Sequence, residues 1–221
     1  MGPEIIAYAK HDGEQMAKIK ETPPLADRGS DRILQILTVA AELFAQKGYD
    51  GTSMRDVAET CDISKSLLYH HFKSKDDIYN QITLGTTHQL YLYVAKNIPE
   101  DGTSAEKIKA FMVATAEFFQ RYRWAWIAST YSFWGNSDRA GQQERMVWRD
   151  RYEGLLRELI NRGIASGELR DVDAPLTGRL ILSSLNWMPR WYNPQRVLSA
   201  TQIAEEYFQL IFKGIENDRA S

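Results

Sequence analysis

The sequence is poor in cysteine: Cys61 is the only one among 221 residues. A single cysteine excludes an intrachain disulfide and a metal site built from cysteines. We expect Cys61 to be a buried structural thiol, with redox sensing as the less favoured alternative. The sequence also lacks a signal peptide and any run of about 18 apolar residues. These absences predict a cytoplasmic protein with no membrane partner.

Signatures of catalytic and cofactor sites are missing as well. The four histidines form no H-E-x-x-H pair, and there is neither a G-x-S-x-G motif nor a phosphate-cradling glycine loop. His70 and His71 are neighbours, so on a helix their side chains point about 100° apart and cannot easily share a metal. We therefore expect no enzyme, no catalytic residue, no cofactor and no bound metal. Turnover in a broad substrate screen would reopen the enzyme alternative.

Positive charge is not in excess. The chain has 27 Lys and Arg against 29 Asp and Glu, a formal net charge of −2. Even the segment from Arg28 to Lys75 holds seven basic and six acidic residues, a net of +1. Any affinity for DNA must therefore come from the placement of charges and from dimerisation, not from bulk charge.

One stretch, residues 53–75, carries a specific pattern of two short helices joined by a tight turn. Ser53 and Asp56 have the S-x-x-D spacing of a capping box, and Ser64 can cap the second helix. At about 100° per residue, one arc of that second helix is polar and another packs inward. The polar arc holds Lys65, Ser66, Tyr69 and His70, and the inner arc holds Leu68, His71 and Phe72. Such a pair is typical of a helix-turn-helix that places its second helix in the major groove.

The residues of this stretch resemble the N-terminal domain of TetR-family transcriptional regulators. The resemblance rests on GYDGTSMRDVA at 48–58, on ISK at 63–65 and on LYHHFKSK at 68–75, within a region of about residues 31 to 80. It implies a homodimeric repressor that binds a palindromic operator in double-stranded DNA and releases it when a small effector enters the C-terminal domain. Leu67 departs from the family pattern, which more often has a small or hydroxyl residue there. Because leucine cannot hydrogen-bond a base, we interpret it as a thymine-methyl contact or as packing.

The predicted DNA contacts follow from the polar arc and the neighbouring helix starts. Lys65, Ser66 and His70 are expected at base edges or nearby phosphates, and the Tyr69 hydroxyl at a phosphate. Thr52 and Ser53, at the start of the first motif helix, and Lys75, at the start of the following helix, would add contacts with the DNA backbone. Free amides at a helix start favour an anion such as a phosphate. The predicted set is Thr52, Ser53, Arg55, Lys65, Ser66, Leu67, Tyr69, His70 and Lys75.

Apolar spacing predicts an all-α fold with a three-helix head on a helical body. Residues 1–30 are expected to be a flexible arm, 31–76 the helix-turn-helix domain, and 77–221 the ligand-binding and dimerisation domain. Outside the motif, helices are predicted at about 31–47, 75–97, 104–121, 124–135, 138–166, 173–187 and 199–217. A helical ligand-binding or scaffold protein with a vestigial motif remains the alternative.

The middle of the body is rich in aromatic residues, which either fill the core or line a cavity for an apolar ligand. The candidate pocket residues are Phe119, Tyr122, Trp126, Tyr131, Trp134, Trp148, Tyr152 and Trp187. Arg123 and Arg149 are candidates for holding an anionic group, since a guanidinium pairs well with phosphate or carboxylate. Residues 185–194 resemble the same stretch of TetR-family regulators of fatty-acyl and sterol-type catabolism. That resemblance implies an acyl-CoA or a related lipid-like effector.

The last two predicted helices are expected to form the dimer interface. Small residues on the first would allow close helix approach, and an apolar stripe on the second would face the partner. An intramolecular core is the alternative at each position. The predicted interface residues are Gly178, Ser184, Ile203, Tyr207, Leu210 and Ile211.

Overall fold

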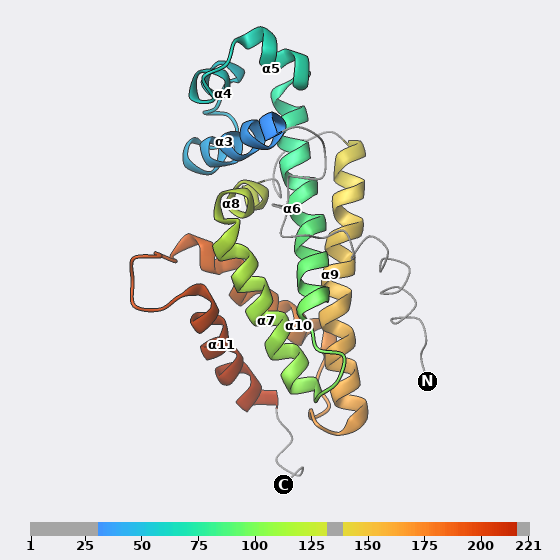
Figure 1. The fold of residues 1–221 in the computed structure, drawn as a ribbon. Coiled ribbons are helices and arrows are strands. Elements are labelled where there is room, and N and C mark those ends of the chain that lie inside the picture. Colours follow the sequence, from blue (N-terminus) through green and yellow to red (C-terminus); the bar gives the residue numbers. More distant parts are fainter. Residues whose placement is uncertain (1–30, 132–138, 216–221) are drawn as a thin grey trace.

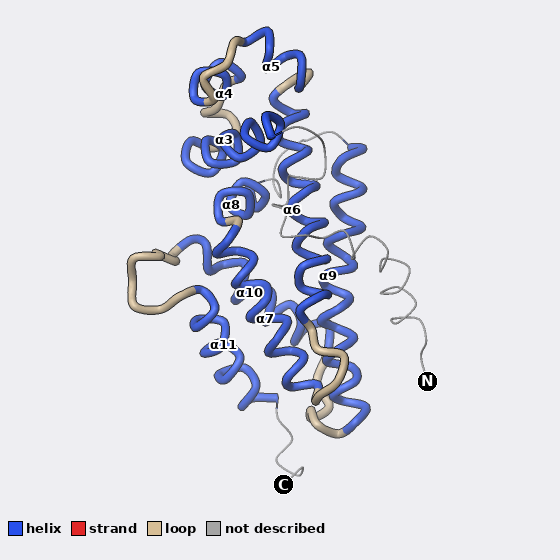
Figure 2. The backbone as a smooth tube through the Cα atoms, in the orientation of Figure 1, coloured by secondary structure: helices blue, strands red, loops and turns tan. Residues whose placement is uncertain are grey.

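The computed structural model describes residues 31–131 and 139–215. Throughout these two ranges the regular structure is helical, with nine α-helices and one short 3-10 helix (Figures 1 and 2). A small head of three helices stands at one end of a larger helical body (Figure 1). The predicted all-α architecture is confirmed.

The head consists of α3 (Asp31–Lys47), α4 (Met54–Thr60) and α5 (Lys65–His71). Gly48 follows the last residue of α3, with a φ of 76° that suits glycine and an N–H that donates to the Phe44 carbonyl at 3.0 Å. The predicted capping box at α4 is present, because the Asp56 carboxylate accepts from the Ser53 N–H at 2.7 Å. Ser64 caps α5 by accepting from the Leu67 N–H at 3.1 Å. Local capping chemistry therefore sets the helix boundaries of the motif.

Helix α6 (Lys75–Asn97) joins the head to the body without a break (Figure 1). Its first turns place Ile78 and Ile82 in the core of the head, and later turns place Leu90 and Val94 in the core of the body. The head therefore extends into α6 beyond residue 76, where its boundary was predicted. One continuous helix is therefore shared by the two parts.

The body contains the remaining helices, and the predicted ends at 135, 138 and 217 lie outside the described residues. These helices are α7 (Ser104–Arg121), α8 (Arg123–Tyr131), α9 (Arg139–Ser166), α10 (Ala174–Trp187), the 3-10 helix η2 (Met188–Arg190) and α11 (Ala200–Ile215). Thr103 and Asp173 cap α7 and α10 with their side chains. No described helix is both long and apolar enough to cross a membrane.

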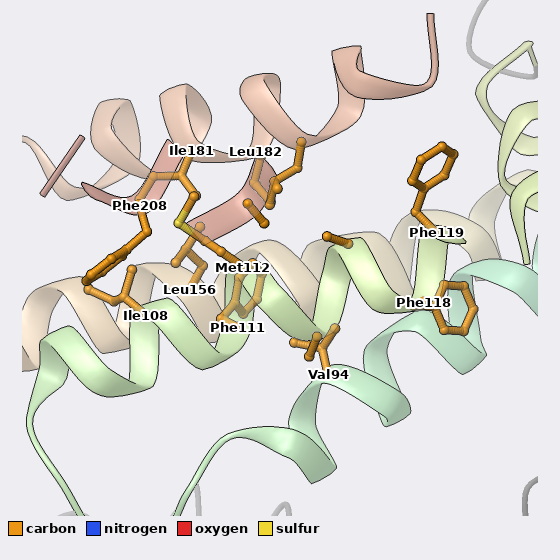
Figure 3. Close-up of a cluster of buried hydrophobic side chains, with 14 of the residues drawn as sticks. Val94, Ile108, Phe111, Met112, Phe118, Phe119, Leu156, Ile181, Leu182 and Phe208 are labelled. Carbon is orange, nitrogen blue, oxygen red and sulfur yellow. The ribbon is translucent and has the colours of Figure 1, made fainter. Parts of the chain in front are cut away.

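Two separate apolar cores lie in the head and the body. The body core extends from Ile108 and Phe208 at one end to Phe118 and Phe119 at the other (Figure 3). The head core contains the buried Cys61, in agreement with the sequence, and burial raises the pKa of its thiol. Helix α8 lies between the two parts and contributes side chains to both cores (Figure 1).

Candidate DNA interface and effector region

The second motif helix, α5, presents its polar arc to solvent as predicted. Leu68 is fully buried against the head core, whereas Lys65, Ser66 and His70 on the other side are exposed. Tyr69 is 53 % exposed, which leaves its hydroxyl accessible to a phosphate. The exposed flank of α5 therefore has the donors that a major-groove contact needs.

Leu67 is also partly exposed and belongs to the outer surface of α5. Its exposure agrees better with a contact to a thymine methyl than with packing inside the head. His71 is half-buried, and its ring lies 5.3 Å from that of His70, centroid to centroid. The two neighbouring histidines thus have different surroundings, as helix geometry requires.

A surface hollow lies beside α5, where the starts of α4, α5 and α6 approach one another. Three cationic side chains, Arg55, Lys65 and Lys75, contribute to its lining. Ser53 and Tyr69 lie in the same hollow. Cations and hydroxyl donors gathered in one hollow suit a DNA phosphate, although the chain as a whole is slightly acidic.

Thr52 also lines this hollow, but its hydroxyl does not serve as a DNA donor. The side chain is only 1 % exposed. Its hydroxyl donates to the carbonyls of Gly48 and Leu43 at 2.9 and 3.3 Å, which ties the loop after α3 to that helix. The Thr52 N–H also donates to the Tyr49 carbonyl, at 3.3 Å, so this amide is not free for the predicted phosphate contact.

Lys75 and Arg55 make interactions within the head that the sequence did not reveal. The Lys75 ammonium donates to the Tyr49 carbonyl at 2.8 Å and lies 4.1 Å from the centroid of the Tyr49 ring. Tyr49 in turn donates to Asp76 at 2.6 Å, and desolvation together with this carboxylate raises the pKa of the phenol. Arg55 pairs with Glu59 at 2.6 Å on the exposed side of α4. Lys75 is thus held in place at the edge of the hollow, whereas Arg55 must exchange an acidic partner for a phosphate.

Three of the candidate pocket residues lie in the body core. Phe119, Trp126 and Tyr152 are buried there, and the Tyr152 hydroxyl is 2.8 Å from Thr115 Oγ1. Burial raises the pKa of Tyr152. Tyr122 is half-buried, with its ring 4.8 Å from that of Phe118. Phe119, Trp126 and Tyr122 group around the last turns of α7, whereas Tyr152 stacks on Phe111 near the middle of that helix.

The other pocket candidates are not brought into this group. Trp187 is 60 % exposed and stacks with Arg190, so its assignment to a pocket is wrong. Trp148 lies between α6 and α9, with its ring 4.0 Å from that of His88. The side chain of Tyr131 and the whole of Trp134 lie outside the described residues.

The two arginines proposed for an anionic group differ in their surroundings. Arg149 pairs with Asp150 at 3.1 Å and with Glu153 at 3.7 Å, so carboxylates already engage it. Arg123 lies at the start of α8, with its guanidinium 5.1 Å from the Trp124 ring centroid. One turn before Arg149, Arg145 donates to Thr83 Oγ1 of α6 at 2.6 Å, and burial lowers its pKa. Of these two arginines of α9, Arg145 therefore connects the helix to α6 and Arg149 pairs with acids of its own helix.

Helices α10 and α11 have an outer apolar surface, but it is not formed mainly by the predicted residues. Gly178 and Ile203 are buried and face the body core, so their assignment to a dimer interface is wrong. Leu210 is 71 % exposed, as the prediction requires. Tyr207, Ile211 and Ser184 are half-buried, the first two against the body core.

The outward residues of α10 that the sequence prediction missed are Leu176, Leu180 and Trp187. They recur at helical spacing and are all at least 58 % exposed. Their spacing of four and seven residues could have revealed this apolar stripe. The prediction instead placed the dimer interface on the side of α10 that carries small residues. We name the outer stripe of α10 together with Leu210 of α11 the α10/α11 face.

Two family models match the sequence. The model of "Bacterial regulatory proteins, tetR family" matches residues 36–82, and that of the "Tetracyclin repressor-like, C-terminal domain" matches residues 101–215, more than half of the chain. The chain belongs to the TetR family of DNA-binding transcriptional repressors. Membership of this regulator family confirms the prediction that the chain is not an enzyme.

Individual TetR-family relatives cover most of the chain. The HTH-type transcriptional repressor KstR2 of Mycobacterium tuberculosis is 27 % identical over 204 residues, 88 % of this chain and 98 % of KstR2. The crystal structure of PfmR from Thermus thermophilus is 36 % identical with a TM-score of 0.77, covering 82 % of this chain and 99 % of PfmR. The structure of AibR in complex with isovaleryl coenzyme A and operator DNA has a TM-score of 0.71 at 23 % identity, covering 82 % of this chain and 98 % of AibR.

Proposed function

We propose that this TetR-family protein is a homodimeric repressor that binds a palindromic operator and leaves it when an acyl-type effector binds the body. The observation that carries the proposal is the exposed flank of α5 beside a hollow lined by three cations. Phosphate contacts from the hollow would orient the head, and Ser66 and His70 would read base edges. Leu67 would add an apolar contact.

The α10/α11 face supports dimerisation. Leu176, Leu180, Trp187 and Leu210 are large apolar side chains with more than half of their surface exposed. Burying such side chains against the same stripe of a second copy removes them from water and gives a closed, two-fold symmetric pair. A dimer also explains how a nearly neutral head can bind DNA, because two heads reach two half-sites at once.

The body supports the choice of an apolar effector. Its core ends near the head in an aromatic group of Phe118, Phe119, Tyr122 and Trp126. The related AibR forms a complex with isovaleryl coenzyme A and operator DNA, and the related KstR2 is a ketosteroid transcriptional regulator. An acyl-CoA or a similar lipid-like molecule is therefore the effector class that we propose.

The connection between effector and operator runs through α6 and α8. Helix α6 belongs to both cores, and the Tyr79 hydroxyl of α6 donates to the Ala128 carbonyl of α8 at 3.0 Å. An effector that repacks the aromatic end of the body would change the tilt of these helices under the head. The two heads would then no longer match successive major grooves, which are about 34 Å apart along the duplex.

Selection from a random duplex library by the purified protein tests the proposal. The selection is run alone and with a panel of acyl-CoAs and aromatic acids. We expect one palindrome to be enriched alone and lost with one member of the panel. Failure to enrich any sequence at low salt would contradict the regulator function and favour the vestigial-motif alternative. Enrichment that no panel member changes would contradict the effector class only.

A further inference from the structure

Helix α8 has a different role on each side. Trp124, Ala125 and Ala128 pack in or against the head core. Trp126 belongs to the body core, where its ring lies 5.8 Å from Phe119, centroid to centroid. A molecule bound next to Trp126 would therefore touch the body and the helix that supports the head at the same time.

The indole of Trp126 is buried with an unsatisfied donor. The residue is 5 % exposed, and its Nε1 has no hydrogen-bond acceptor among the residues that the structure describes. A buried donor without an acceptor is unfavourable, so such groups are rare in native proteins and point to a missing partner. The missing partner must supply an acceptor inside the apolar end of the body.

A second donor of the same kind lies one turn earlier on α8. Arg123 Nε is also buried, and within the described ranges it has no hydrogen-bond acceptor. Residues three apart on a helix lie on the same side of it, about 60° apart around the axis. Trp126 and Arg123 thus start from one side of α8, and the Arg123 guanidinium lies 5.1 Å from the centroid of the Trp124 ring. We call Trp126 and Arg123 the α8 donor pair.

The surroundings define what the α8 donor pair can bind. Phe118 and Phe119 lie beside Trp126, and Phe118 also contacts Tyr122. A ligand there needs an apolar part for these rings and an acceptor for the two N–H groups. The positive charge of Arg123 favours an acceptor that carries negative charge or a strong dipole.

We infer that the α8 donor pair is the polar end of the effector site and binds the carboxylate of a fatty acid or the thioester carbonyl of its CoA derivative. The inference rests on the proposed function, because it specifies where and through which atoms the effector acts. Both ligand types share an acyl carbon bearing an oxygen acceptor at the end of an apolar chain. In both cases the acceptor reaches α8 directly, and the chain lies among the rings.

The test compares three variants of the full-length protein by calorimetric titration. The probes are medium-chain fatty acids, their CoA thioesters and the matching primary alcohols. Trp126→Phe keeps an aromatic ring but removes the N–H, and Arg123→Gln removes the positive charge. Trp191→Phe is the matched control, since it makes the same substitution at a partly exposed position outside α8.

We expect Trp126→Phe to lower the affinity for the tighter-binding acyl probe about tenfold, because the substitution removes one hydrogen bond to a desolvated acceptor. Arg123→Gln should weaken the fatty acid about tenfold or more and leave the affinity for the neutral alcohol nearly unchanged. Trp191→Phe should leave both affinities unchanged. The acid and thioester titrations of the wild type show which of the two sources the site prefers.

Three outcomes would overturn the inference. They are wild-type protein that binds no acid and no thioester, acid affinity that survives both substitutions in the donor pair, and Arg123→Gln weakening acid and alcohol equally. DNA binding without a probe is measured on the same samples with the selected operator. If the protein does not bind DNA but binds the acid through the donor pair, the proposed function alone is contradicted. If it binds DNA but no acyl probe, the α8 site alone is contradicted.

Discussion

The head and the body reach order by different means. In the head, short helices begin at side-chain caps such as Ser53 and Ser64, and each polar cap lies within three residues of its partner. In the body, long helices meet through aromatic side chains distant in sequence, such as Phe111 of α7 and Tyr152 of α9, whose ring centroids are 4.9 Å apart. Because caps require particular residues at fixed spacing, the head resembles its family residue by residue. The body depends on packing between distant aromatic side chains, so its sequence resembles the family only as a helical pattern.

The largest effect is expected from a substitution in the body, where one added charge should break the dimer and so weaken operator binding by both heads. Leu180→Glu places a carboxylate in the centre of the α10/α11 face, and burying it against a second copy would be unfavourable. We expect a monomer with operator affinity reduced about a hundredfold or more, because two linked contacts become one. Sedimentation and fluorescence anisotropy measure the two effects. Val147→Glu, at a similarly exposed position on α9, is the control and should remain dimeric.

The head should be the more fragile of the two regions. Leu68→Ala removes a fully buried side chain on which α5 packs, and we expect a loss of about 2–5 kcal/mol in the free energy of unfolding. Thermal unfolding should then show the head melting before the body. A single transition at the wild-type temperature would show that α5 contributes little to the head core.

Within the body, the close approach of α9 and α7 should be sensitive to one methyl group. A Cβ added at Gly163 would lie 2.7 Å from Leu169 Cδ1 and 2.9 Å from Ser104 Cβ. We expect Gly163→Ala to lower the free energy of unfolding by about 1–3 kcal/mol through overpacking. Gly154→Ala is the control on the same helix, because its added Cβ meets only the Arg157 guanidinium at 3.9 Å. Equal stability of the two variants would contradict the tight contact.

Substitutions in α5 should distinguish a phosphate contact, expected for Tyr69, from a base contact, expected for Ser66. Tyr69→Phe removes one phosphate donor, so we expect operator affinity to fall only a few-fold and equally for all sequences. Substitution of Ser66 should instead change which operators are preferred. A library selection with each variant measures both properties. A Ser66 variant with the wild-type preference would contradict the assigned orientation of α5.

The smallest effect is expected from the caps of α4 and α7. The Ser53 hydroxyl and backbone lower the pKa of Asp56, and the Thr103 backbone and hydroxyl lower that of Glu106. Because the folded pKa values are lowered, the stabilising effect is present at neutral pH and is lost as the pH falls below the ordinary carboxyl range. We expect the double variant Asp56→Asn, Glu106→Gln to show a shallower loss of thermal stability in acid than the wild type. Identical slopes would contradict the role of these caps.

The sequence predicted those parts of the molecule that depend on neighbouring residues. The capping box at Ser53, the exposed arc of α5 and the ends of α6 follow from spacing along one segment. The hydrogen bonds of the Thr52 hydroxyl could not be predicted, because one acceptor is the Leu43 carbonyl nine residues away, which spacing within the motif does not reveal. The mutual arrangement of Lys75, Tyr49 and Asp76 depends in the same way on two separate helix ends meeting.

In the body, periodicity identified the helices but not which side of each faces inward. Gly178 and Ile203 were expected on the outside, yet both lie against the body core, whereas Leu176 and Leu180 are outside. Either stripe of α10 fits a period of 3.6 residues, and only the position of α9 decides between them. Trp187 was assigned to the pocket for a similar reason, since an aromatic residue at the end of a helix can point to either side.

The distance between the two heads of the dimer, measured by pulsed electron resonance, is the most sensitive reporter of the proposed mechanism. A spin label at Thr60→Cys, on the exposed end of α4, reports this distance, and the native Cys61 is buried. We predict a spacing in the DNA complex that is also populated in the free dimer, and a different spacing when the acyl effector is bound. An unchanged distance distribution on addition of an effector that releases the operator would contradict the mechanism.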